Sequence, residues 1–325
     1  MIRRSFLVLC FGLGLVRAAR AQGPTTLRRI AHLSGLSKDI GERWLAAFRD
    51  GMRQLGYVEE RDFTLESRFA AGDFARLASQ AAELTRAKPH LFLVYGAEAA
   101  QAAAKAAPTL PIVLANAQDP VASGLVANLA RPGGNITGMS DDHSASSTKR
   151  LELLKEALPG LSRVALFWRA GHAAHPRQVP ELQAAGRSLG LAVVPMEVVS
   201  MPAIEQAFTA MKRENIGAVL MLGDAFLSAH MGPIIDLGFR HRIVAMYTTR
   251  AFAQAGGMIA YGADIGELVR RSAKHVDRIF KGAKPGDLPI ELPVKFDLVL
   301  NAKSAKALGV TLPRSLLLRA DHVIE

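Results

Sequence analysis

Cysteine is almost absent from this chain of 325 residues, because the only one, Cys10, lies in an apolar segment near the N-terminus. That segment has the features of a removable export signal, so the mature chain is expected to have no thiol. This excludes disulfides, thiolate metal sites and cysteine nucleophiles. Leu7 to Leu9 are not the small residues that usually precede a lipidated cysteine, so no lipoprotein is expected. The fold must rely on hydrophobic cores, for which an apolar content of 50% is ample.

Aromatic residues are also scarce, at 6%, and no basic run exceeds two or three residues. The net charge is +11, but four of the 40 basic residues lie in the export signal, which leaves 36 against 29 acidic residues and a net charge of +7. Nucleic-acid surfaces usually concentrate basic groups and interleave stacking rings. We therefore expect no nucleic-acid partner.

The chain also lacks the short motifs of several enzyme classes. Gly12-x-Gly14 lies in the signal, and the stretch from Arg131 to Asn135 has neither the spacing nor the following helix of a phosphate-binding loop. No Gly-x-Ser-x-Gly nucleophile elbow is present. His172 and His175 have a spacing that occurs in metal-ligand pairs, but no third ligand is evident, so they are interpreted as solvated loop histidines. We expect no catalytic residue, no metal and no cofactor.

Residues 1–21 are predicted to be the export signal. Arg3 and Arg4 supply its basic start, Phe6–Val16 is its apolar core, and small residues ending at Ala21 suit a signal peptidase. Cleavage after Ala21 by either the Sec or the twin-arginine route would deliver the protein to the periplasm. The apolar run is too short to span a bilayer stably, although a short membrane anchor is the alternative.

What the sequence does contain is an internal repeat. Arg29 and Arg163 begin similar β-α-β-α-β patterns 134 residues apart, Gly56 and Gly190 are equally spaced, and Gly96 lies 127 residues before Gly223. Two such units predict an α/β fold of two similar doubly wound parallel-sheet lobes joined by a multi-strand hinge, with a cleft between them. The alternative is that α/β chains resemble one another at this level of detail.

The expected domains interleave along the chain. The first lobe is predicted to comprise 28–138 plus 264–290, and the second 139–263 plus 291–325. Phe63–Phe69 alternates apolar and polar residues like an edge strand, and Leu91–Tyr95 is apolar throughout like a central one. Ile136–Met139 is expected to cross between the lobes, and Val294–Leu300 to be the last strand.

Residues that follow the expected strands are the candidate ligand-binding residues. In open parallel sheets ligands bind outside the carboxyl ends of the strands, and in a two-lobed protein those ends face the cleft. The candidates are Ser34, Gly96, Ala97, Glu98, Asn116, Asp119, Ser140, Asp141, Trp168, Asp224, Phe226, Tyr247, Tyr261 and Asp264. Closure is expected to bring the first-lobe candidates Ser34, Glu98 and Asn116 against candidates of the second lobe, namely Ser140, Trp168, Asp224 and Phe226.

The candidates suggest roles by their chemistry. Small residues before a helix suit an anionic group, which unpaired backbone N–H groups can bind. Asp119, Asp224 or Asp264 could bind an ammonium group, although a helix N-cap is the alternative for each acid. The aromatic candidates could form an apolar wall, although core packing is their alternative. They are Trp168, Phe226, Tyr247 and Tyr261.

Several segments resemble one known family. They include FRDGMRQLGYVEERDFTLESR, DPVASGLVANLARPGGNITG, KRLELLKEALPGLSRVALFW and the tail from YGADIGEL to the end. Together they resemble the ABC-transporter substrate-binding protein family of the type I periplasmic fold, which includes tryptophan- and tyrosine-binding members. The resemblance covers nearly all of the mature chain. It implies a receptor without enzymatic activity that closes over a small solute and delivers it to an ABC permease in the inner membrane.

Two departures from the family pattern fall at expected ligand contacts. This chain has Gly96-Ala97-Glu98-Ala99 where the family often has Gly-Thr-Pro-Ala after the third strand. It has Trp168-Arg169-Ala170 where the family often has tryptophan followed by Asn-Pro. The first departure removes a hydroxyl and places the charged Glu98 beside that position, and the second replaces an amide by the charged Arg169. Both point to a more acidic or amphoteric ligand than an aromatic amino acid.

We therefore expect a monomeric, extracytoplasmic solute-binding receptor of an ABC importer that clamps an amino-acid-like or carboxylate ligand. Two alternatives share the same sequence features. One is a two-lobed α/β enzyme using the same cleft, which would require an assembled nucleophile or paired carboxylates. The other is a ligand sensor domain without transport.

Overall fold

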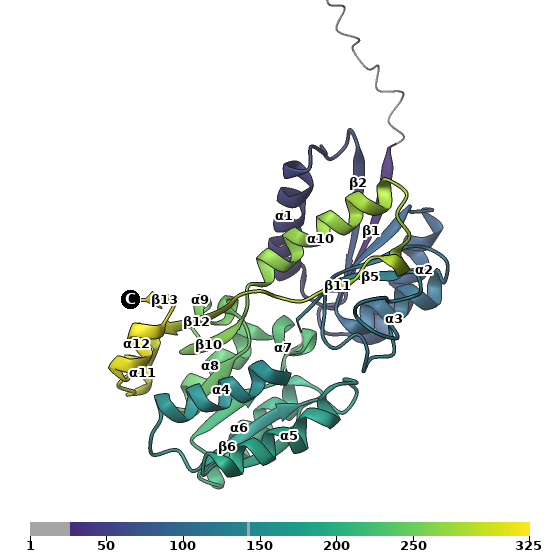
Figure 1. Ribbon diagram of the computed structural model, residues 1–325. Helices are drawn as coiled ribbons and strands as arrows, with labels where there is room; N and C mark the ends of the chain where they lie inside the picture. Colours follow the sequence, from purple (N-terminus) through teal and green to yellow (C-terminus); the bar gives the residue numbers. More distant parts are fainter. Residues whose placement is uncertain (1–26, 142–143) are drawn as a thin grey trace, which may run out of the picture.

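Two β-sheets, each covered by helices on both faces, form the two lobes of the protein (Figure 1). The structure is a computed structural model that describes residues 27–141 and 144–325. The predicted export signal lies outside the described residues. Within these ranges, no helix combines the length and the apolar character needed to cross a bilayer.

The first sheet has six strands in the order β11-β5-β4-β3-β1-β2, and every pair is parallel. The strands are β1 (Arg28–Ser34), β2 (Phe63–Phe69), β3 (Leu91–Tyr95), β4 (Ile112–Ala117), β5 (Ile136–Ser140) and β11 (Ile290–Glu291). The position of β2 at the edge and the fully covered position of β3 confirm what their residue patterns predicted.

The second sheet has seven strands in the order β13-β12-β10-β9-β8-β6-β7, and only β10 and β12 pair antiparallel. The strands are β6 (Arg163–Trp168), β7 (Ala192–Glu197), β8 (Ala218–Met221), β9 (Val244–Tyr247), β10 (Ile259–Ala263), β12 (Phe296–Asn301) and β13 (His322–Ile324). The order β4-β3-β1-β2 in one sheet corresponds to β9-β8-β6-β7 in the other. The structure thus confirms the repeat read from the sequence.

Alternating strand residues pack against different helices in the first lobe. Ile30 and Leu93 face α1 and α10, whereas Leu33 and Phe92 face α2 and α3, because successive side chains of a strand point to opposite faces. The helices are α1 (Lys38–Gln54), η1 (Phe74–Arg76), α2 (Leu77–Arg86), α3 (Ala97–Ala106), α10 (Ile265–Phe280) and η2 (Pro285–Asp287). Both sheet faces are therefore buried, as a parallel sheet requires.

The second lobe repeats this layering. Phe167 and Val219 pack toward α6, α8 and α9, whereas Leu166 and Leu220 pack toward α4, α5 and the C-terminal helices. The helices are α4 (Ser144–Ala157), α5 (His175–Ser188), α6 (Met201–Arg213), α7 (Ala225–Ala229), α8 (Met231–His241), α9 (Arg250–Gln254), α11 (Ala302–Leu308) and α12 (Arg314–Arg319).

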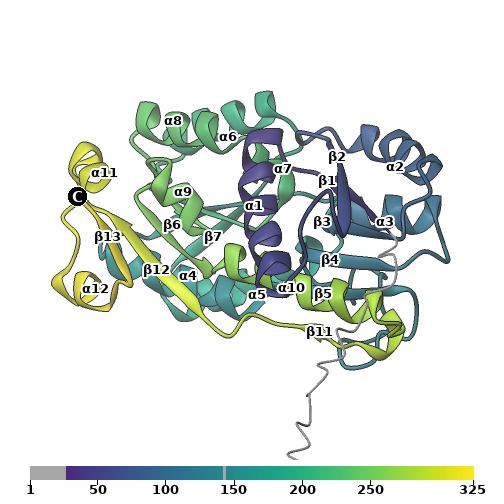
Figure 2. The same ribbon diagram turned by 90° about the horizontal axis from the view of Figure 1, so that it is seen from above.

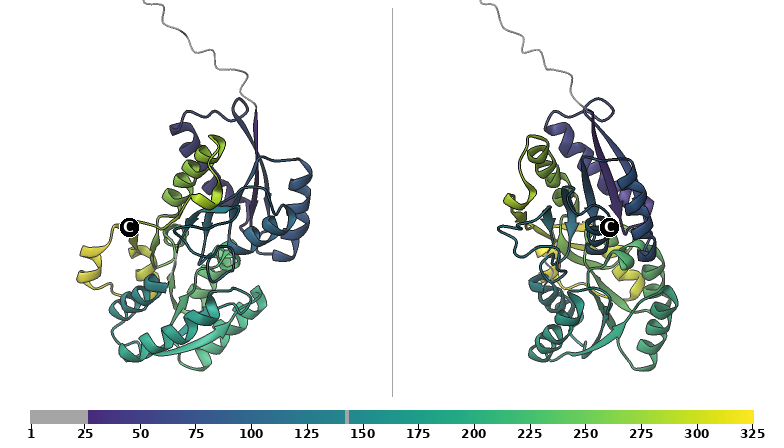
Figure 3. Two further views of the ribbon diagram at one scale, coloured as in Figure 1. Left: turned by 45° about the vertical axis from the view of Figure 1, so that its right-hand side comes forward. Right: turned by 90° about the vertical axis from the view of Figure 1, so that its right-hand side faces the viewer.

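The chain passes between the lobes at three connections. It goes from β5 to α4, from β10 back to α10, and from β11 to β12, the last of which runs from one sheet to the other in Figure 2. Helix α10 follows a strand of the second sheet but packs beside α1 on the first lobe, so the lobes exchange elements. Figure 3 shows the two lobes one above the other.

Some expectations about elements were wrong. Ile136–Met139 does not cross between the lobes, because β5 lies in the first sheet, and Ser140 with it. The last strand is β13 rather than the one near residue 300. No local sequence signal indicates which sheet β5 joins, because that depends on the close approach of β5 to β4 at Gly138. A three-residue edge strand such as β13 is too short to give a periodic signal.

Candidate functional site

A small cleft between the lobes has an accessible volume of about 30 Å³. Its walls come from the segments that follow β3, β4 and β5 of the first sheet and β6, β8 and β9 of the second. The lining residues are Tyr95, Gly96, Ala97, Glu98, Asn116, Ala117, Gln118, Asp141, His172, Asp224, Ala225, Ser228, Thr248 and Thr249. The carboxyl ends of the parallel strands of both lobes therefore converge on one space, as expected for an open α/β sheet.

Six of the sequence-derived candidates lie in this lining. They are Gly96, Ala97, Glu98, Asn116, Asp141 and Asp224. Gly96 precedes α3 with a φ of 100°, a left-handed conformation that favours glycine, and no side chain caps the first turn of the helix. The N-terminal end of α3, with its unpaired backbone N–H groups, thus opens into the cleft.

The other polar candidates lie elsewhere. Ser34 is buried in the first lobe, where its Oγ accepts a hydrogen bond from the Leu36 N–H at 3.1 Å. Ser140 is buried at the end of β5. Asp264 is exposed and caps α10, since its Oδ1 accepts the Glu267 N–H at 3.0 Å.

The four aromatic candidates do not line the cleft in this structure. Phe226 and Tyr247 are buried in the core of the second lobe, and the Tyr247 ring stacks on Phe252 at 4.7 Å. Trp168 and Tyr261 are partly buried against the other core of that lobe. Core packing therefore accounts for their positions, and the only aromatic side chain in the lining is Tyr95, among the described residues.

Several lining residues were missed. Tyr95 and Gln118 are direct neighbours of candidate positions, so a slightly wider window at each strand end would have included them. Ser228 lies one turn into α7, where no sequence signal distinguishes a cleft-facing hydroxyl from a surface one.

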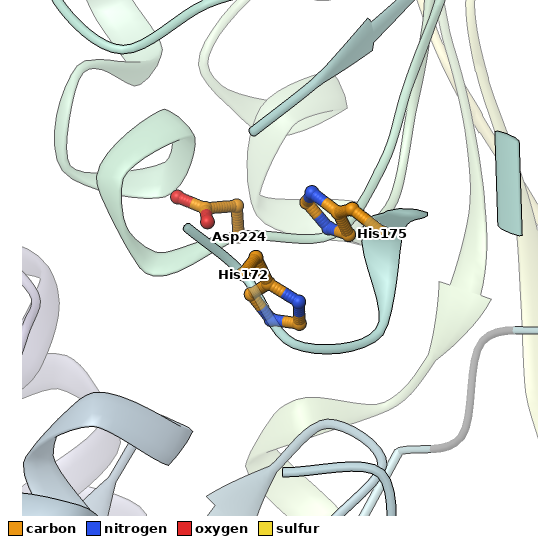
Figure 4. A group of neighbouring side chains, drawn as sticks. All are labelled: His172, His175 and Asp224. Atoms are coloured by element: carbon orange, nitrogen blue, oxygen red, sulfur yellow. The ribbon is translucent and has the colours of Figure 1, made fainter. Parts of the chain in front are cut away.

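The interpretation of His172 and His175 as solvated loop residues was wrong, because both side chains are buried. The two rings stack with their centroids 4.0 Å apart, and Asp224 lies beside them (Figure 4). The third potential ligand, Asp224, was not evident because it is almost fifty residues away in the sequence, on the loop after β8. Histidine, histidine and aspartate offer three potential metal ligands within 4.8 Å of one another.

The hydrogen bonds of this group nevertheless fit a structural role. The Arg169 N–H donates to Nδ1 of His175 at 3.0 Å, so Nε2 carries the proton and donates to the Gly223 carbonyl at 3.0 Å. Burial, followed by the nearby His172, lowers the pKa of His175 to about 3, which keeps the ring neutral. Asp224 Oδ1 meanwhile accepts the Phe226 and Leu227 N–H groups. His175 therefore ties the loop after β6 to the loop after β8.

Arg169 connects the lobes across the cleft. Its guanidinium forms ion pairs with Asp224 of its own lobe, at 2.8 Å, and with Glu98 of the first lobe. It also lies over the ring of Phe74, 4.6 Å from the centroid. Burial acts to lower the pKa of Arg169, but the charges of Asp224 and Glu98 outweigh it and raise the pKa above its ordinary value. The two charged departures from the family pattern, Glu98 and Arg169, thus contact each other.

A second ion pair between the lobes lies at the rim of the cleft. Arg177 Nη2 of α5 lies 2.6 Å from Oδ2 of Asp119, which the sequence had suggested as an ammonium ligand. The lobes also touch near Gly72, where an added Cβ would lie 2.8 Å from the His230 ring. The structure therefore has the two lobes closed on each other.

Comparisons with known proteins agree with this architecture. The sequence profile of the family described as ABC transporter substrate binding protein matches residues 30–324. This chain belongs to that family.

Similar proteins include both sequence and structural relatives. A tyrosine-binding protein of Clostridioides difficile (strain R20291) is 23% identical over 263 residues, which is 81% of this chain and 75% of the relative. An ABC domain from Streptococcus pneumoniae, solved in complex with L-Trp, is 26% identical with a TM-score of 0.85, covering 92% of this chain and all of the other. A conserved domain protein from Vibrio cholerae has the same TM-score and coverages at 24% identity.

Membership of this family accounts for the two-lobed architecture and makes the cleft the candidate binding site for a solute. The protein is thus a substrate-binding protein of the ABC transporter family, with two lobes of the periplasmic-binding-protein type. The family relationship alone does not fix the ligand.

Proposed function

We propose that this protein is the extracytoplasmic, monomeric solute receptor of an ABC importer. It binds a small amino-acid-like or carboxylate solute in the interlobe cleft and releases it to a permease in the inner membrane. The lobes open and close about the three connections that join them, near Ser140, Asp264 and the segment between β11 and β12. Hinge closure around a ligand is the established mode of motion for this architecture.

The strand ends of both lobes converge on one polar cleft, and this convergence supports the proposal. The lining combines an uncapped helix N-terminus at Gly96 with the acidic side chains of Glu98, Asp141 and Asp224. A helix N-terminus favours a carboxylate, and acidic side chains favour an ammonium group. Such a lining suits a small solute that carries one or both of these charges.

The cleft is proposed to bind without catalysis. Its two central carboxylates, Glu98 and Asp224, are both engaged by Arg169, and Asp224 also caps α7. Catalysis by a pair of carboxylates would need both of them free to act on a substrate, and Asp224 is held by Arg169 and by its capping hydrogen bonds. A solute recovered chemically unchanged after prolonged incubation supports the receptor, whereas turnover of a bound solute favours the two-lobed enzyme.

Export to the periplasm is the part of the proposal that depends on residues 1–21. Expression of the full chain in a Gram-negative host, followed by fractionation, is expected to place the mature protein in the periplasmic fraction with Gln22 at its N-terminus. A full-length protein that stays with the membrane fraction would favour the membrane-anchor alternative.

Isothermal titration combined with small-angle X-ray scattering tests the receptor function. The panel contains the common amino acids, short-chain amines, small carboxylates and pentoses. At least one solute is expected to bind one-to-one and to lower the radius of gyration. Asn116→Ala, in the lining, is expected to weaken that binding about tenfold, since it removes a hydrogen bond to the ligand.

A matched control is Glu83→Gln, which removes one of the two acidic partners of Arg68 on the surface of the first lobe. It is expected to leave the affinity unchanged. If no solute in the panel binds and none changes the radius of gyration, the receptor function is rejected.

A further inference from the structure

The ion pair between Arg169 and Glu98 lies at the cleft, since Glu98 belongs to its lining. Arg169 is only 11% exposed and Glu98 19%, and Asp224, which also contacts Arg169, is fully buried. The guanidinium lies over the Phe74 ring as well. Two carboxylates and an aromatic face are the groups that bind an organic cation in proteins. The protein therefore places its own cation, the Arg169 guanidinium, among groups that could bind an organic cation.

The charges of this cluster do not balance. Two carboxylates, Glu98 and Asp224, face the single guanidinium of Arg169, which leaves one negative charge in excess. The remaining acid of the lining, Asp141, is offset by the buried Arg150, whose pKa its charge affects. A solute that brings one positive charge therefore neutralises the cleft, whereas a purely anionic solute adds to its excess of negative charge.

Asn116 gives a second, independent indication that the solute carries an N–H donor. Its side chain is 3% exposed and lines the cleft, and its Oδ1 has no hydrogen-bond partner among the described residues. A buried carbonyl oxygen without a donor is unfavourable, so a partner is expected in the functional complex. An N–H donor on the solute would supply that partner on the same wall of the cleft as Glu98.

We propose that Glu98 and Asn116 form a subsite for a protonated nitrogen, and that Arg169 competes with the solute for Glu98. The solute is then a small organic amine or guanidine, with or without a carboxylate, and not a plain carboxylate or a sugar. On binding, its ammonium group replaces the Arg169 guanidinium at Glu98, while Arg169 keeps its ion pair with Asp224. This inference rests on the proposed receptor function and narrows the class of ligand.

Four probes of similar skeleton test it by isothermal titration with the full-length mature protein. L-norvaline carries both charges, L-ornithine has one further ammonium group, butylamine has an ammonium group only, and pentanoate has a carboxylate only. The three nitrogen-bearing probes are expected to bind and pentanoate is not. D-ribose serves as the uncharged probe and is also expected not to bind.

Two substitutions are expected to change affinity in opposite directions. Glu98→Gln is expected to weaken binding of the nitrogen-bearing probes about 10- to 100-fold, since it removes a charge-assisted hydrogen bond. Arg169→Gln is expected to strengthen binding of the same probes about tenfold, because it removes the internal competitor. A purely structural role would make both variants weaker, so the sign of the second effect is decisive.

Arg177→Gln is the matched control, because it removes an ion pair between the lobes without touching the cleft lining. It is expected to leave the preference among the probes unchanged. Thermal melts establish that each variant is folded, and Glu98→Asp provides a conservative variant that retains the charge.

The possible outcomes distinguish a failure of the cation subsite from a failure of the receptor function. Binding of pentanoate or D-ribose with compaction, but of no nitrogen-bearing probe, overturns the cation subsite and leaves the receptor intact. Equal affinities for wild type and Glu98→Gln also overturn it. If no solute binds, either among these probes or in the wider panel, both proposals are rejected.

Discussion

Gly138 is the residue at which the first sheet has least room for a side chain. Its φ is 128°, and an added Cβ would lie 2.3 Å from the backbone oxygen of Leu114 on β4. The register between β4 and β5 shifts after Leu114, so the two backbones approach closely there. Only glycine meets both conditions, the close contact and the positive φ.

Gly138→Ala is therefore expected to lower the free energy of unfolding by about 3 kcal/mol, from backbone strain and overpacking together. Gly134→Ala is the control from the same segment, because no atom lies within 4 Å of its added Cβ. It is expected to change stability by less than about 0.5 kcal/mol. Urea denaturation of both variants measures the difference, and equal stabilities would contradict the close approach seen here.

Two buried histidines make stability depend on pH. Burial, followed by the charge of Arg49, lowers the pKa of His32 to about 3, and His175 has a pKa similarly lowered to about 3. In the unfolded chain each pKa returns to about 6.5, so the unfolded state binds more protons between pH 6.5 and 3. The folded protein consequently loses stability as pH falls through this window, by about 1.4 kcal/mol per pH unit for each ring.

His32→Leu isolates one of these contributions. Leucine is expected to fit, since the His32 ring is buried and its Nδ1 has no hydrogen-bond partner among the described residues. Between pH 6 and 5 the stability of the variant relative to wild type is expected to rise by about 1.4 kcal/mol. Urea titrations at the two pH values measure it, and a relative stability that does not change with pH would mean that His32 titrates normally in the folded state.

At the scale of elements, helix α10 illustrates how capping fixes a helix start. Asp264 accepts the Glu267 N–H, which confirms the N-cap alternative that the sequence offered for this acid. Asp264→Ala is expected to lower the free energy of unfolding by about 1 kcal/mol, and Asp264→Ser by less, because serine also caps. A calorimetric comparison of the two variants tests this. Equal losses would show that the carboxylate acts through something other than capping.

Most elements were predictable because their signals are local. Apolar runs such as Leu91–Tyr95 and helical periodicity such as that of Leu45, Phe48 and Met52 report directly on which side chains are buried. The repeat then predicted two similar sheets, and the four strands of each repeat do have the same order in both. The position of β5 and the presence of β13 were not predictable, because one depends on a single glycine contact and the other has only three residues.

The candidate site was predictable only in outline. The rule that ligands bind at strand ends located the cleft, and six candidates line it. The rule could not tell which side chains point inward, so Trp168 and Tyr247 were proposed although they pack in or against cores. The contact of Arg169 with Glu98 depends on how the lobes are oriented, and nothing in the local sequence encodes that orientation.

At the scale of the whole molecule, the two ion pairs between the lobes contribute unequally to closure. The Arg177–Asp119 pair is at the rim, with Arg177 54% exposed, so its contribution is expected to be below about 1 kcal/mol and to be screened by salt. The Arg169–Glu98 pair is shielded and cation–π contact with Phe74 reinforces it.

Small-angle X-ray scattering can rank the two ion pairs by their contribution to closure of the lobes. Arg177→Gln is expected to leave the radius of gyration nearly unchanged, whereas Arg169→Gln in the absence of added solute is expected to increase it. Raising the salt concentration is expected to reproduce the effect of Arg177→Gln only. A larger opening in Arg177→Gln than in Arg169→Gln would reverse the assigned roles.

The central claim is that the two lobes hold one small, chemically unaltered solute in the cleft between them. Native mass spectrometry of the mature protein, incubated with an equimolar mixture of the panel solutes, tests this most directly. We expect a single one-to-one adduct whose mass equals that of an intact nitrogen-bearing solute, and a much weaker adduct with Glu98→Gln. No adduct with any solute, or the release of a product of altered mass, would contradict it.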